Sequence, residues 1–308
     1  MKTSETARVI TQATPQASIN PLYPLGALLA AALLWGGSFA AMRISVSVLS
    51  PWSAMWVRMA IAFALIAPFV GRSAFKSYEP GDWKMLIPMV LFQPCLYFLL
   101  ESYALTFTTS SQAGVISALV PLFVTAGAWF FLKEKVSRNF ALGLGVTITG
   151  VIGLTLLDSP GLKAENPLLG NSLELAAMGS AAINMIIVKQ LSARYSPWAL
   201  TAMQMLAGTI FFLPGLPLLI QAGPAIWTPK LIFAMGFLGF FVTLGAFGLY
   251  NWGMSHVAAS RASIFINLVP VNAVLFGWII LGETLSPLQL VMAGVVLFGV
   301  LFSQQSSS

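Results

Sequence analysis

The sequence predicts an all-α integral membrane protein whose ten transmembrane helices form two inverted five-helix repeats around a central cavity. Three observations lead to this fold class. Of the 308 residues, 58% are hydrophobic and only 8% are charged, whereas a soluble domain carries about 25% charged residues. The apolar residues fall into ten long runs, and the second half of the chain repeats the first. Lipid must therefore surround much of the folded chain.

Each of the ten apolar runs is long enough to cross a bilayer, because about 20 mostly apolar residues span about 30 Å of hydrocarbon. Backbone groups in lipid need partners within their own segment, so each run is expected to be a helix. Ser-Pro pairs, which favour helix starts, precede the second, seventh and tenth runs. The runs are 23–44, 52–71, 84–105, 111–132, 138–157, 168–190, 197–220, 231–253, 260–281 and 287–303.

The internal repeat is clearest between residues 111–151 and 260–300, where 13 of 41 aligned positions are identical. An earlier part of the repeat aligns Ser50-Pro51-Trp52 with Ser196-Pro197-Trp198. Apolar composition alone does not bring a proline, a tryptophan, a carboxylate and a glycine into one register, so we interpret the match as a duplication. These identical pairs are Pro121 and Pro270, Trp129 and Trp278, Glu134 and Glu283, and Gly150 and Gly299.

Lysine and arginine residues predict the orientation, because they are enriched on the cytoplasmic side of membranes. With the N-terminus inside, eleven of them fall in inside segments. Only Arg43, Lys163 and Lys230 fall outside. Both termini are therefore predicted to be cytoplasmic, with residues 1–22 as a disordered arm and 304–308 as a short tail.

The two copies are predicted at 23–157 and 168–303, joined by an external linker at 158–167. Five helices in each copy is an odd number, so the second copy must enter the membrane upside down. Inverted repeats are typical of secondary transporters, which bind substrate near the midplane where the repeats meet. Transport by alternating access is the favoured interpretation. A structural membrane protein and a lipid scramblase remain as alternatives.

Several residues resemble the drug/metabolite transporter superfamily in its ten-helix form with two EamA-type repeats. Trp35-Gly36 with Phe39 resembles that family's opening motif, and Arg58 with Pro68 fits its second helix. The whole chain is most similar to bacterial YddG-type exporters of aromatic amino acids. This resemblance implies a bacterial inner-membrane location and a pathway faced by the first, third, fourth, sixth, eighth and ninth helices. The repeat ends carry Pro121, Glu134 and Gly150, then Pro270, Glu283, Gln289, Gly294 and Gly299.

The substrate cavity is expected where polar or aromatic side chains recur at helical spacing. Gln93, Tyr97 and Glu101, for example, lie on one face of the third span. For any one such residue, hydrogen bonding between helices is an equally good interpretation. The full set of predicted cavity residues is Trp35, Ser38, Phe39, Met42, Gln93, Tyr97, Glu101, Ser110, Gly114, Ser117, Asn184, Thr243, Tyr250, Asn251, Ser263 and Asn267.

Proline and glycine residues supply the candidate bends and close contacts. Pro94, Pro121 and Pro270 are predicted hinges, although prolines also occur in membrane helices for packing alone. Five glycines near the ends of the copies are expected to be close-packing contacts between helices. They are Gly143, Gly145, Gly150, Gly294 and Gly299.

Arg58 and Glu101 are predicted to form a structural ion pair inside the membrane. Their counterparts in the second copy, Gln204 and Tyr250, are both neutral, which fits a pair whose two charges are lost together. The alternatives are that Glu101 couples transport to protons or that Arg58 snorkels. Glu134 and Glu283 occupy tight turns and are expected to accept N–H groups of the helices that follow. His256 is expected in a solvated loop.

Composition also limits the function. We expect no enzyme, because no paired aspartates, Ser-His pair or metal ligands lie at membrane depth, and accordingly no metal or cofactor. Scattered basic residues argue against nucleic acid as a partner. The lone Cys95 cannot form an internal disulfide. The expected partners are the lipid bilayer and an amino-acid-like solute, and a monomer is plausible.

The charge inventory narrows the solute. Arg58 is the one basic residue predicted deep in a span, so several anionic groups would find too few partners. Residues 25–42 contain no carboxylate for a cationic drug. A neutral or zwitterionic amphipathic solute fits best, and amino acids, with aromatic ones preferred, agree with the resemblance. Export of drugs or other metabolites is the alternative within the superfamily.

Overall fold

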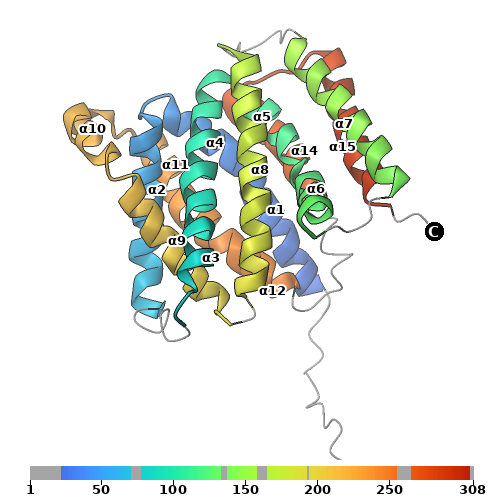
Figure 1. Cartoon of the computed structure of the whole chain (residues 1–308). Helices are drawn as coiled ribbons and strands as arrows, with labels where there is room; N and C mark the ends of the chain where they lie inside the picture. The colour runs from blue at the N-terminus through green and yellow to red at the C-terminus, as the bar shows by residue number, and fades with distance from the viewer. Residues whose placement is uncertain are drawn as a thin grey trace, which may run out of the picture.

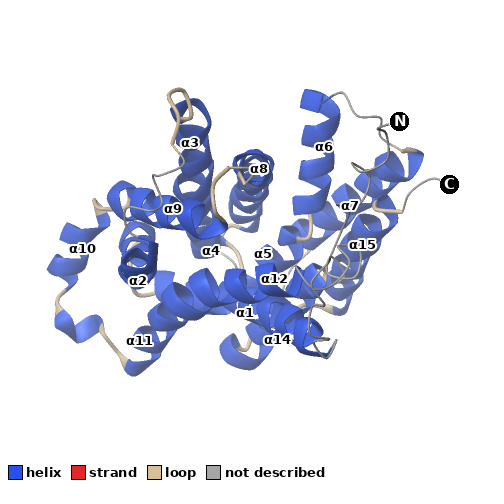
Figure 2. Ribbon diagram, turned by 90° about the horizontal axis from the view of Figure 1, so that it is seen from below, coloured by secondary structure: helices blue, strands red, loops and turns tan. Residues whose placement is uncertain are grey.

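The protein is helical throughout the part of the chain that the computed structural model describes, namely residues 22–70, 78–132, 137–157, 165–192, 194–254 and 265–305. The predicted arm before Leu22, most of the 158–167 linker, and the end of the tail lie outside these ranges. In Figures 1 and 2, α7 and α15 lie side by side at one edge of the molecule and α10 lies at the opposite edge.

The first predicted copy contains long helices and two interrupted ones. The third predicted span is divided by a π-helical segment, η2, and the fourth is divided by a turn. The elements are α1 (Leu22–Val46), α2 (Pro51–Val70), α3 (Trp83–Val90), η2 (Leu91–Leu96), α4 (Tyr97–Phe107), α5 (Ser110–Ser117), α6 (Val120–Leu132) and α7 (Arg138–Leu156).

The second predicted copy shows the same pattern of interruptions. A π-helical segment, η4, divides its third span, and a short 3-10 helix, η3, lies between α10 and α11. The described elements are α8 (Pro167–Leu191), α9 (Pro197–Phe211), α10 (Gly215–Ala222), η3 (Pro224–Ile226), α11 (Pro229–Gly236), η4 (Phe237–Ala246), α12 (Phe247–Met254), α14 (Leu268–Leu281) and α15 (Pro287–Ser303).

Seven helical stretches in the described residues are long and apolar enough to cross a membrane. The number becomes eight if α9 and α10, which bend by 63° between Phe211 and Gly215, form one span. α14 and α15 are shorter apolar helices. Many of their apolar side chains are exposed, Trp278 and Phe298 among them, as expected for surfaces in lipid. The chain is thus a multi-pass membrane protein, while ten spans stay a prediction.

Capping side chains explain where several helices begin. Ser196 and Ser286 each precede a proline and accept a hydrogen bond from the backbone N–H three residues later. The Gln289 side-chain oxygen in turn accepts a hydrogen bond from the Ser286 N–H, which completes a capping box. Proline follows at the first helical position, where no N–H partner is needed. The Ser-Pro signals in the sequence therefore mark real helix starts.

The breaks occur at matching places in the two copies. The turn between α5 and α6 lies at Ala118 and Leu119, just before Val120-Pro121. A turn at Asn267 precedes Leu268-Val269-Pro270 in the same way. Both prolines thus sit in the first turn of a helix rather than in its middle. η2 and η4 likewise interrupt corresponding spans.

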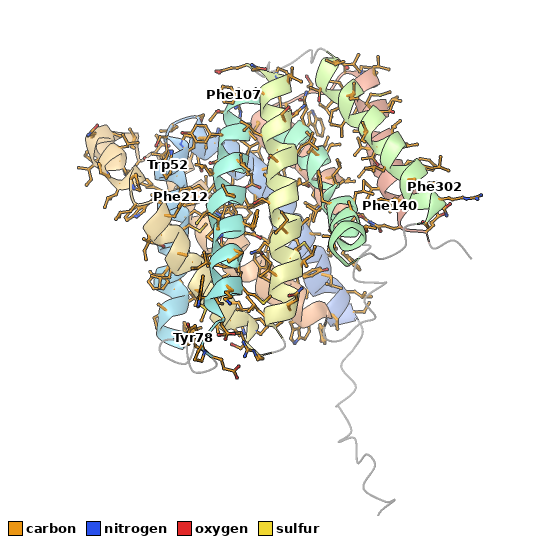
Figure 3. The ribbon with its side chains drawn as sticks, in the orientation of Figure 1. Trp52, Tyr78, Phe107, Phe140, Phe212 and Phe302 are labelled. Carbon is orange, nitrogen blue, oxygen red and sulfur yellow. The ribbon has the colours of Figure 1, made fainter. Side chains whose placement is uncertain are left out.

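Helices from corresponding spans of the two copies pack against each other in antiparallel pairs. On α7 and α15, Gly143 lies against Ser303 while Gly153 lies against Met292. On α5 and α14, Gly114 lies against Ala273 and Gly277 lies against Ser111. α2 pairs with α9 and α10 similarly, and Figure 3 shows Trp52 near Phe212 at that contact, with ring centroids 5.6 Å apart.

Hydrogen bonds fix the relative direction of α1 and α8. Arg43, near the end of α1, donates to the Leu105 carbonyl near the end of α4. Asn166, at the start of α8, donates its N–H to the Phe107 carbonyl at the end of α4, while Asn184 reaches Met89. α1 therefore runs parallel to the α3–α4 span and α8 runs antiparallel to it, as Figure 1 shows.

Three of the five glycines that were expected to be packing contacts are such contacts. A Cβ at Gly143, Gly150 or Gly299 would come within 3 Å of backbone atoms of the partner helix. The expectation is wrong for Gly145 and Gly294, because neither has a heavy atom within 4 Å of the Cβ position. Of the two aligned glycine pairs, Gly150 and Gly299 therefore lie in the contact between the helices, whereas Gly145 and Gly294 lie away from it.

Candidate functional site

A buried charged centre lies where α2, α4 and η4 meet. Arg58 Nη1 lies 3.8 Å from Glu101 Oε2, and both side chains are about 5% exposed. Arg58 Nε also donates to Thr243 Oγ1 at 3.2 Å, and its guanidinium lies over the Phe98 ring at 4.3 Å from the centroid. Tyr97 Oη donates to Glu101 Oε1 at 2.6 Å. The structure thus brings together Arg58 and Glu101, which the sequence predicted as a pair.

This arrangement satisfies both charges but holds them loosely. A direct Arg–carboxylate hydrogen bond is about 2.7–2.9 Å long, so the 3.8 Å separation is an ion pair without that bond. Removing charges from water costs several kcal/mol for each ion, which an ion pair offsets only with further hydrogen bonds. Thr243, Tyr97 and Phe98 supply those contacts. Arg58 and Glu101 therefore compensate each other's charge inside the membrane.

A second polar group surrounds the broken third span. Gln93 has an extended backbone (φ −149°, ψ 122°) within η2, so its carbonyl leaves the helical ladder. Gln204 Nε2 donates to that carbonyl at 2.9 Å, and Asn184 Nδ2 donates to the Met89 carbonyl at 2.7 Å. Ser180 Oγ similarly reaches the Phe92 carbonyl. Side chains from α8 and α9 thus satisfy backbone groups that lipid could not.

The two copies make equivalent contacts here. Arg58 of α2 bonds to Thr243 in the π-helical η4, and Gln204 of α9 bonds to Gln93 in the π-helical η2. Gln204 is the residue that aligns with Arg58 in the repeat. In each copy, the side chain at this aligned position of the second span therefore hydrogen-bonds to the interrupted third span of the other copy.

An aromatic group connects α1 with α12. The Trp35 ring lies 5.1 Å from Tyr250 and 5.5 Å from Phe247, measured between centroids. Ser38 Oγ donates to the Trp35 carbonyl at 2.6 Å, so its hydroxyl is used within α1. Phe39 and Met42 are buried in the core. Offset and edge-on ring contacts of this kind favour aromatic partners.

The remaining predicted cavity residues are mostly engaged in packing. Gly114 is covered by Ala273, and Ser117 Oγ donates to the Gly114 carbonyl at 2.7 Å. Asn267 occupies the N-cap position of α14 without a capping bond from its side chain. Ser263 lies outside the described residues, and so does the side chain of Asn251. Glu134 and His256 also lie outside them.

Ser110, the first residue of α5, is part of a seam between the two copies, here called the upper seam. Glu283, in the turn after α14, accepts hydrogen bonds from the backbone N–H and the hydroxyl of both Ser110 and Ser111, at 2.7–2.9 Å. The prediction that Glu283 caps the following helix is wrong, because Ser286 caps α15. The carboxylate instead caps α5 in the other copy, where the helix dipole favours negative charge.

A hollow of about 650 Å³ lies on the opposite face of α1 from Trp35 and Phe39. Its lining is almost wholly apolar, and none of the predicted cavity residues contributes to it. Phe233, one of its lining residues, is 75% exposed, so the hollow opens on the lipid-facing surface. The lining residues on α1 are Ala30, Leu33, Leu34, Gly37, Ala41 and Ile44.

Glu174 is a buried carboxylate that the sequence reasoning missed. It is fully buried in α8, so three described charged residues, not two, lie deep in spans. Its position seven residues inside the 168–190 run was the available signal, because an ionisable residue in a span is a functional candidate by default. In the sequence, Gln204 is distinguished only as the counterpart of Arg58.

Asp82, the N-cap residue of α3, joins the start of α3 to the segment just before α9. Asp82 Oδ2 accepts from Tyr195 Oη at 2.6 Å and from the Glu79 N–H at 3.0 Å, and Arg194 forms ion pairs with Asp82 and Glu79. The Tyr195 hydrogen bond, followed by the Glu79 N–H and Arg194, lowers the pKa of Asp82 below its usual 3.8. Burial and this bond raise the pKa of Tyr195 to about 12.

Known proteins similar to the chain identify its family. The model of the EamA-like transporter family matches twice, at residues 23–156 and 168–304. The chain belongs to the EamA-like transporter family, within the drug/metabolite transporter superfamily. The two matches are its two EamA repeats.

Relatives of this EamA-like protein are mostly transporters without an assigned substrate. An uncharacterized transporter of Archaeoglobus fulgidus is 30% identical over 86% of this chain and 93% of its own length. The uncharacterized transporter YetK of Bacillus subtilis is 26% identical over 89% and 84%. A probable terminal-alkyne amino-acid exporter of Streptantibioticus cattleyicolor is 24% identical over 89% and 91%.

A solved crystal structure shares the fold with a TM-score of 0.59. It covers 91% of this chain and 96% of its own at 17% identity, so the likeness concerns the fold alone. Membership in the family makes the chain a membrane transporter. It leaves the substrate and the energy source to be inferred from the residues.

Proposed function

We propose that this EamA-like protein is a secondary transporter that exports amino acids, with aromatic ones preferred, by alternating access. In this proposal ten spans form two inverted five-helix repeats in a bacterial inner membrane, with both termini in the cytoplasm. The observation that carries the substrate is the neutral Arg58–Glu101 centre beside aromatic rings. Export of drugs or other metabolites is the second possibility within the family.

The inverted arrangement is supported by the antiparallel pairs α7–α15 and α5–α14 and by the opposite directions of α1 and α8. The equivalent contacts of Arg58 and Gln204 with the opposite copy support it further. Interrupted helices near the midplane are a feature of transporters built from inverted repeats. η2 and η4 are such interruptions, and each can change shape without breaking a long continuous helix.

The substrate class follows from the chemistry around the seam. Arg58 and Glu101 offer one positive and one negative group, the complement of an amino-acid carboxylate and ammonium. Tyr97, Phe98, Trp35 and Tyr250 add aromatic surface on neighbouring helices. A multiply charged anion would leave charge uncompensated in a site that holds one described cation. The exporter from Streptantibioticus cattleyicolor, named for an amino-acid substrate, agrees with this choice.

The upper seam acts as the closed gate in this proposal. Glu283 bonds to both Ser110 and Ser111, and Thr108 donates to Asn171 Oδ1 at 2.7 Å. Gln289 Nε2 donates to the Leu157 carbonyl at 2.9 Å. These bonds all join the two copies at one side. Opening toward that side therefore requires Glu283 to leave the start of α5.

The test is uptake into proteoliposomes preloaded with unlabelled amino acid, with radiolabelled solutes presented one at a time. Phenylalanine and tryptophan should exchange faster than glutamate, lysine or a cationic dye. An Arg58→Gln/Glu101→Gln variant that stays folded should lose this preference. Equal exchange of all solutes, or exchange of the dye alone, would overturn the amino-acid proposal and favour the drug exporter.

A further inference from the structure

Glu174 is a buried carboxylate of α8 that stands apart from the other ionisable groups in the described spans. The residue is 0% exposed, and neither of its oxygens has a hydrogen-bond partner among the described residues. It follows Pro167, the first residue of α8, by seven positions, which is about 10 Å at 1.5 Å per residue. An isolated ionised carboxylate at such a site is so costly that the group is held neutral instead.

Glu101 lies close enough to Glu174 for their charges to interact, but its surroundings differ. Glu101 accepts from Tyr97 Oη at 2.6 Å and lies 3.8 Å from Arg58. One guanidinium can neutralise one of the two carboxylates, and it lies beside Glu101. The second carboxylate must then carry a proton to keep the buried group uncharged overall.

We propose that Glu174 is the proton-binding site through which transport is coupled to a proton gradient. This proposal rests on the proposed transport function and adds its energy source. Glu174 holds a proton in the conformation described. It releases the proton when the helices rearrange and water reaches its carboxyl from the other side of the membrane. The O–H bond is the only bond that forms or breaks, and the proton passes between Glu174 and water.

The groups around Glu174 make it the site that titrates. Tyr97 and Glu101 of α4 lie close enough to Glu174 for their charges to interact with it, and Arg58 of α2 pairs with Glu101. The other elements packed on α8 offer Cys95 in η2, Lys84 at the start of α3 and Arg138 at the start of α7. α5 and α6 contain no ionisable residue. A proton leaving Glu174 therefore disturbs the Glu101–Arg58 pair directly.

That coupling explains how protonation and substrate can exclude each other. When Glu174 is ionised, it competes with Glu101 for Arg58, and the group gains one negative charge. The ammonium of an entering amino acid would then offset the Glu174 charge locally, while the carboxylate of the same solute, which is neutral overall, would pair with Arg58. A proton and an amino acid would thus be carried in opposite directions, one replacing the other.

Proton occupancy can be measured without any transport. Dicyclohexylcarbodiimide is an apolar reagent that modifies protonated carboxyls, and modified peptides are identified by mass spectrometry. In the full-length protein in detergent at pH 7.5, Glu174 should be modified. The matched control is Glu165, an exposed carboxylate two residues before the start of α8, which should not be modified. Modification of Glu101 in place of Glu174, or of neither, would overturn the proposal.

Transport supplies the second readout, with Glu174→Gln compared with Glu165→Gln. A coupled protein should accumulate solute about tenfold for each pH unit of gradient if one proton is exchanged for each solute. Glu174→Gln, which mimics the protonated carboxyl, should lose this accumulation, while Glu165→Gln should keep both amino-acid exchange and accumulation. Undiminished accumulation by Glu174→Gln refutes the proton site. Absence of any amino-acid exchange by the unmodified protein refutes the proposed substrate, and the labelling result still decides on Glu174.

Discussion

At the scale of single residues, two groups of paired charges stabilise the protein. Arg58 and Glu101 form a buried pair with Tyr97, Phe98 and Thr243 around it. Asp82 and Arg194 form the corresponding surface group, with Tyr195 bonded to the carboxylate. The first group is buried inside the membrane and the second lies at its surface. The buried group is therefore tested by removing its charges, and the surface group by changing the pH.

Removing one partner of the buried pair should cost more than removing both. Arg58→Gln leaves Glu101 without its cation, and Glu101→Gln leaves Arg58 uncompensated, so each should destabilise the protein by about 3–5 kcal/mol. The double variant should be less destabilised than either single variant, because the second copy tolerates the neutral Gln204 and Tyr250 at these positions. Reversible unfolding in mixed detergent measures this, and additive losses would argue against a pair.

Acid should weaken the Asp82 contacts in a defined direction. The native pKa of Asp82 is lowered by Tyr195, the Glu79 N–H and Arg194, so its stabilisation is complete at neutral pH. The stabilisation is lost as the pH falls below the usual 3.8 and through the lowered value. The Tm difference between the unmodified protein and Asp82→Asn should therefore close in acid. Glu165→Gln is the control, and a gap that stays constant with pH would contradict the assignment.

At the scale of elements, the interrupted helices and the glycine faces decide how the copies meet. The turns before Pro121 and Pro270 and the segments η2 and η4 occur at corresponding places. Side chains of the opposite copy donate hydrogen bonds to the carbonyls that these interruptions leave free, as Gln204 does to the Gln93 carbonyl. Where the helices are unbroken, small residues let backbones approach, as at Gly299.

Two glycines of α15 offer a matched test of that approach. A Cβ on Gly299 would lie 2.4 Å from Thr147 Oγ1 and 2.8 Å from the Gly143 carbonyl oxygen, whereas Gly294 has open space. Gly299→Ala should therefore destabilise the α7–α15 contact by about 1–3 kcal/mol. Gly294→Ala should be neutral or up to about 1 kcal/mol stabilising. Equal effects on Tm in detergent would show that the α7–α15 contact is not formed.

At the scale of the whole molecule, the family and the arrangement of its copies define the transporter. The EamA model matches each half, and contacts between the halves are repeated with the roles of the copies exchanged. The described residues account for seven or eight candidate spans. The inverted ten-span arrangement therefore needs a direct measurement of topology.

Equivalent loops should face opposite sides of the membrane if the copies are inverted. Pro80 precedes the third span of the first copy and Ala225 precedes the third span of the second, and both are exposed. In a Cys95→Ala background, Ala225→Cys should react with an impermeant maleimide in intact cells. Pro80→Cys should react only after permeabilisation. Reaction of both from outside would exclude the inverted arrangement.

The sequence by itself determined the membrane class, the duplication and the helix starts. These features can be recognised in the sequence without knowledge of how the helices pack. They are the hydropathy, the repeated identities such as Pro121 with Pro270, and the Ser-Pro caps. The sequence also predicted that Arg58 and Glu101 pair inside the membrane, because their counterparts in the second copy, Gln204 and Tyr250, are both neutral.

Only the tertiary structure decided which side chains meet across helices. The spacing of residues along one helix does not show which other helix lies against it. The sequence therefore predicted that Glu283 caps the helix after its own turn, although it binds the start of α5. The same reason explains Gly145 and Gly294, and above all Glu174. Its missing hydrogen-bond partners become visible only when α4 and α8 are packed together, since burial is a property of neighbours and not of the chain.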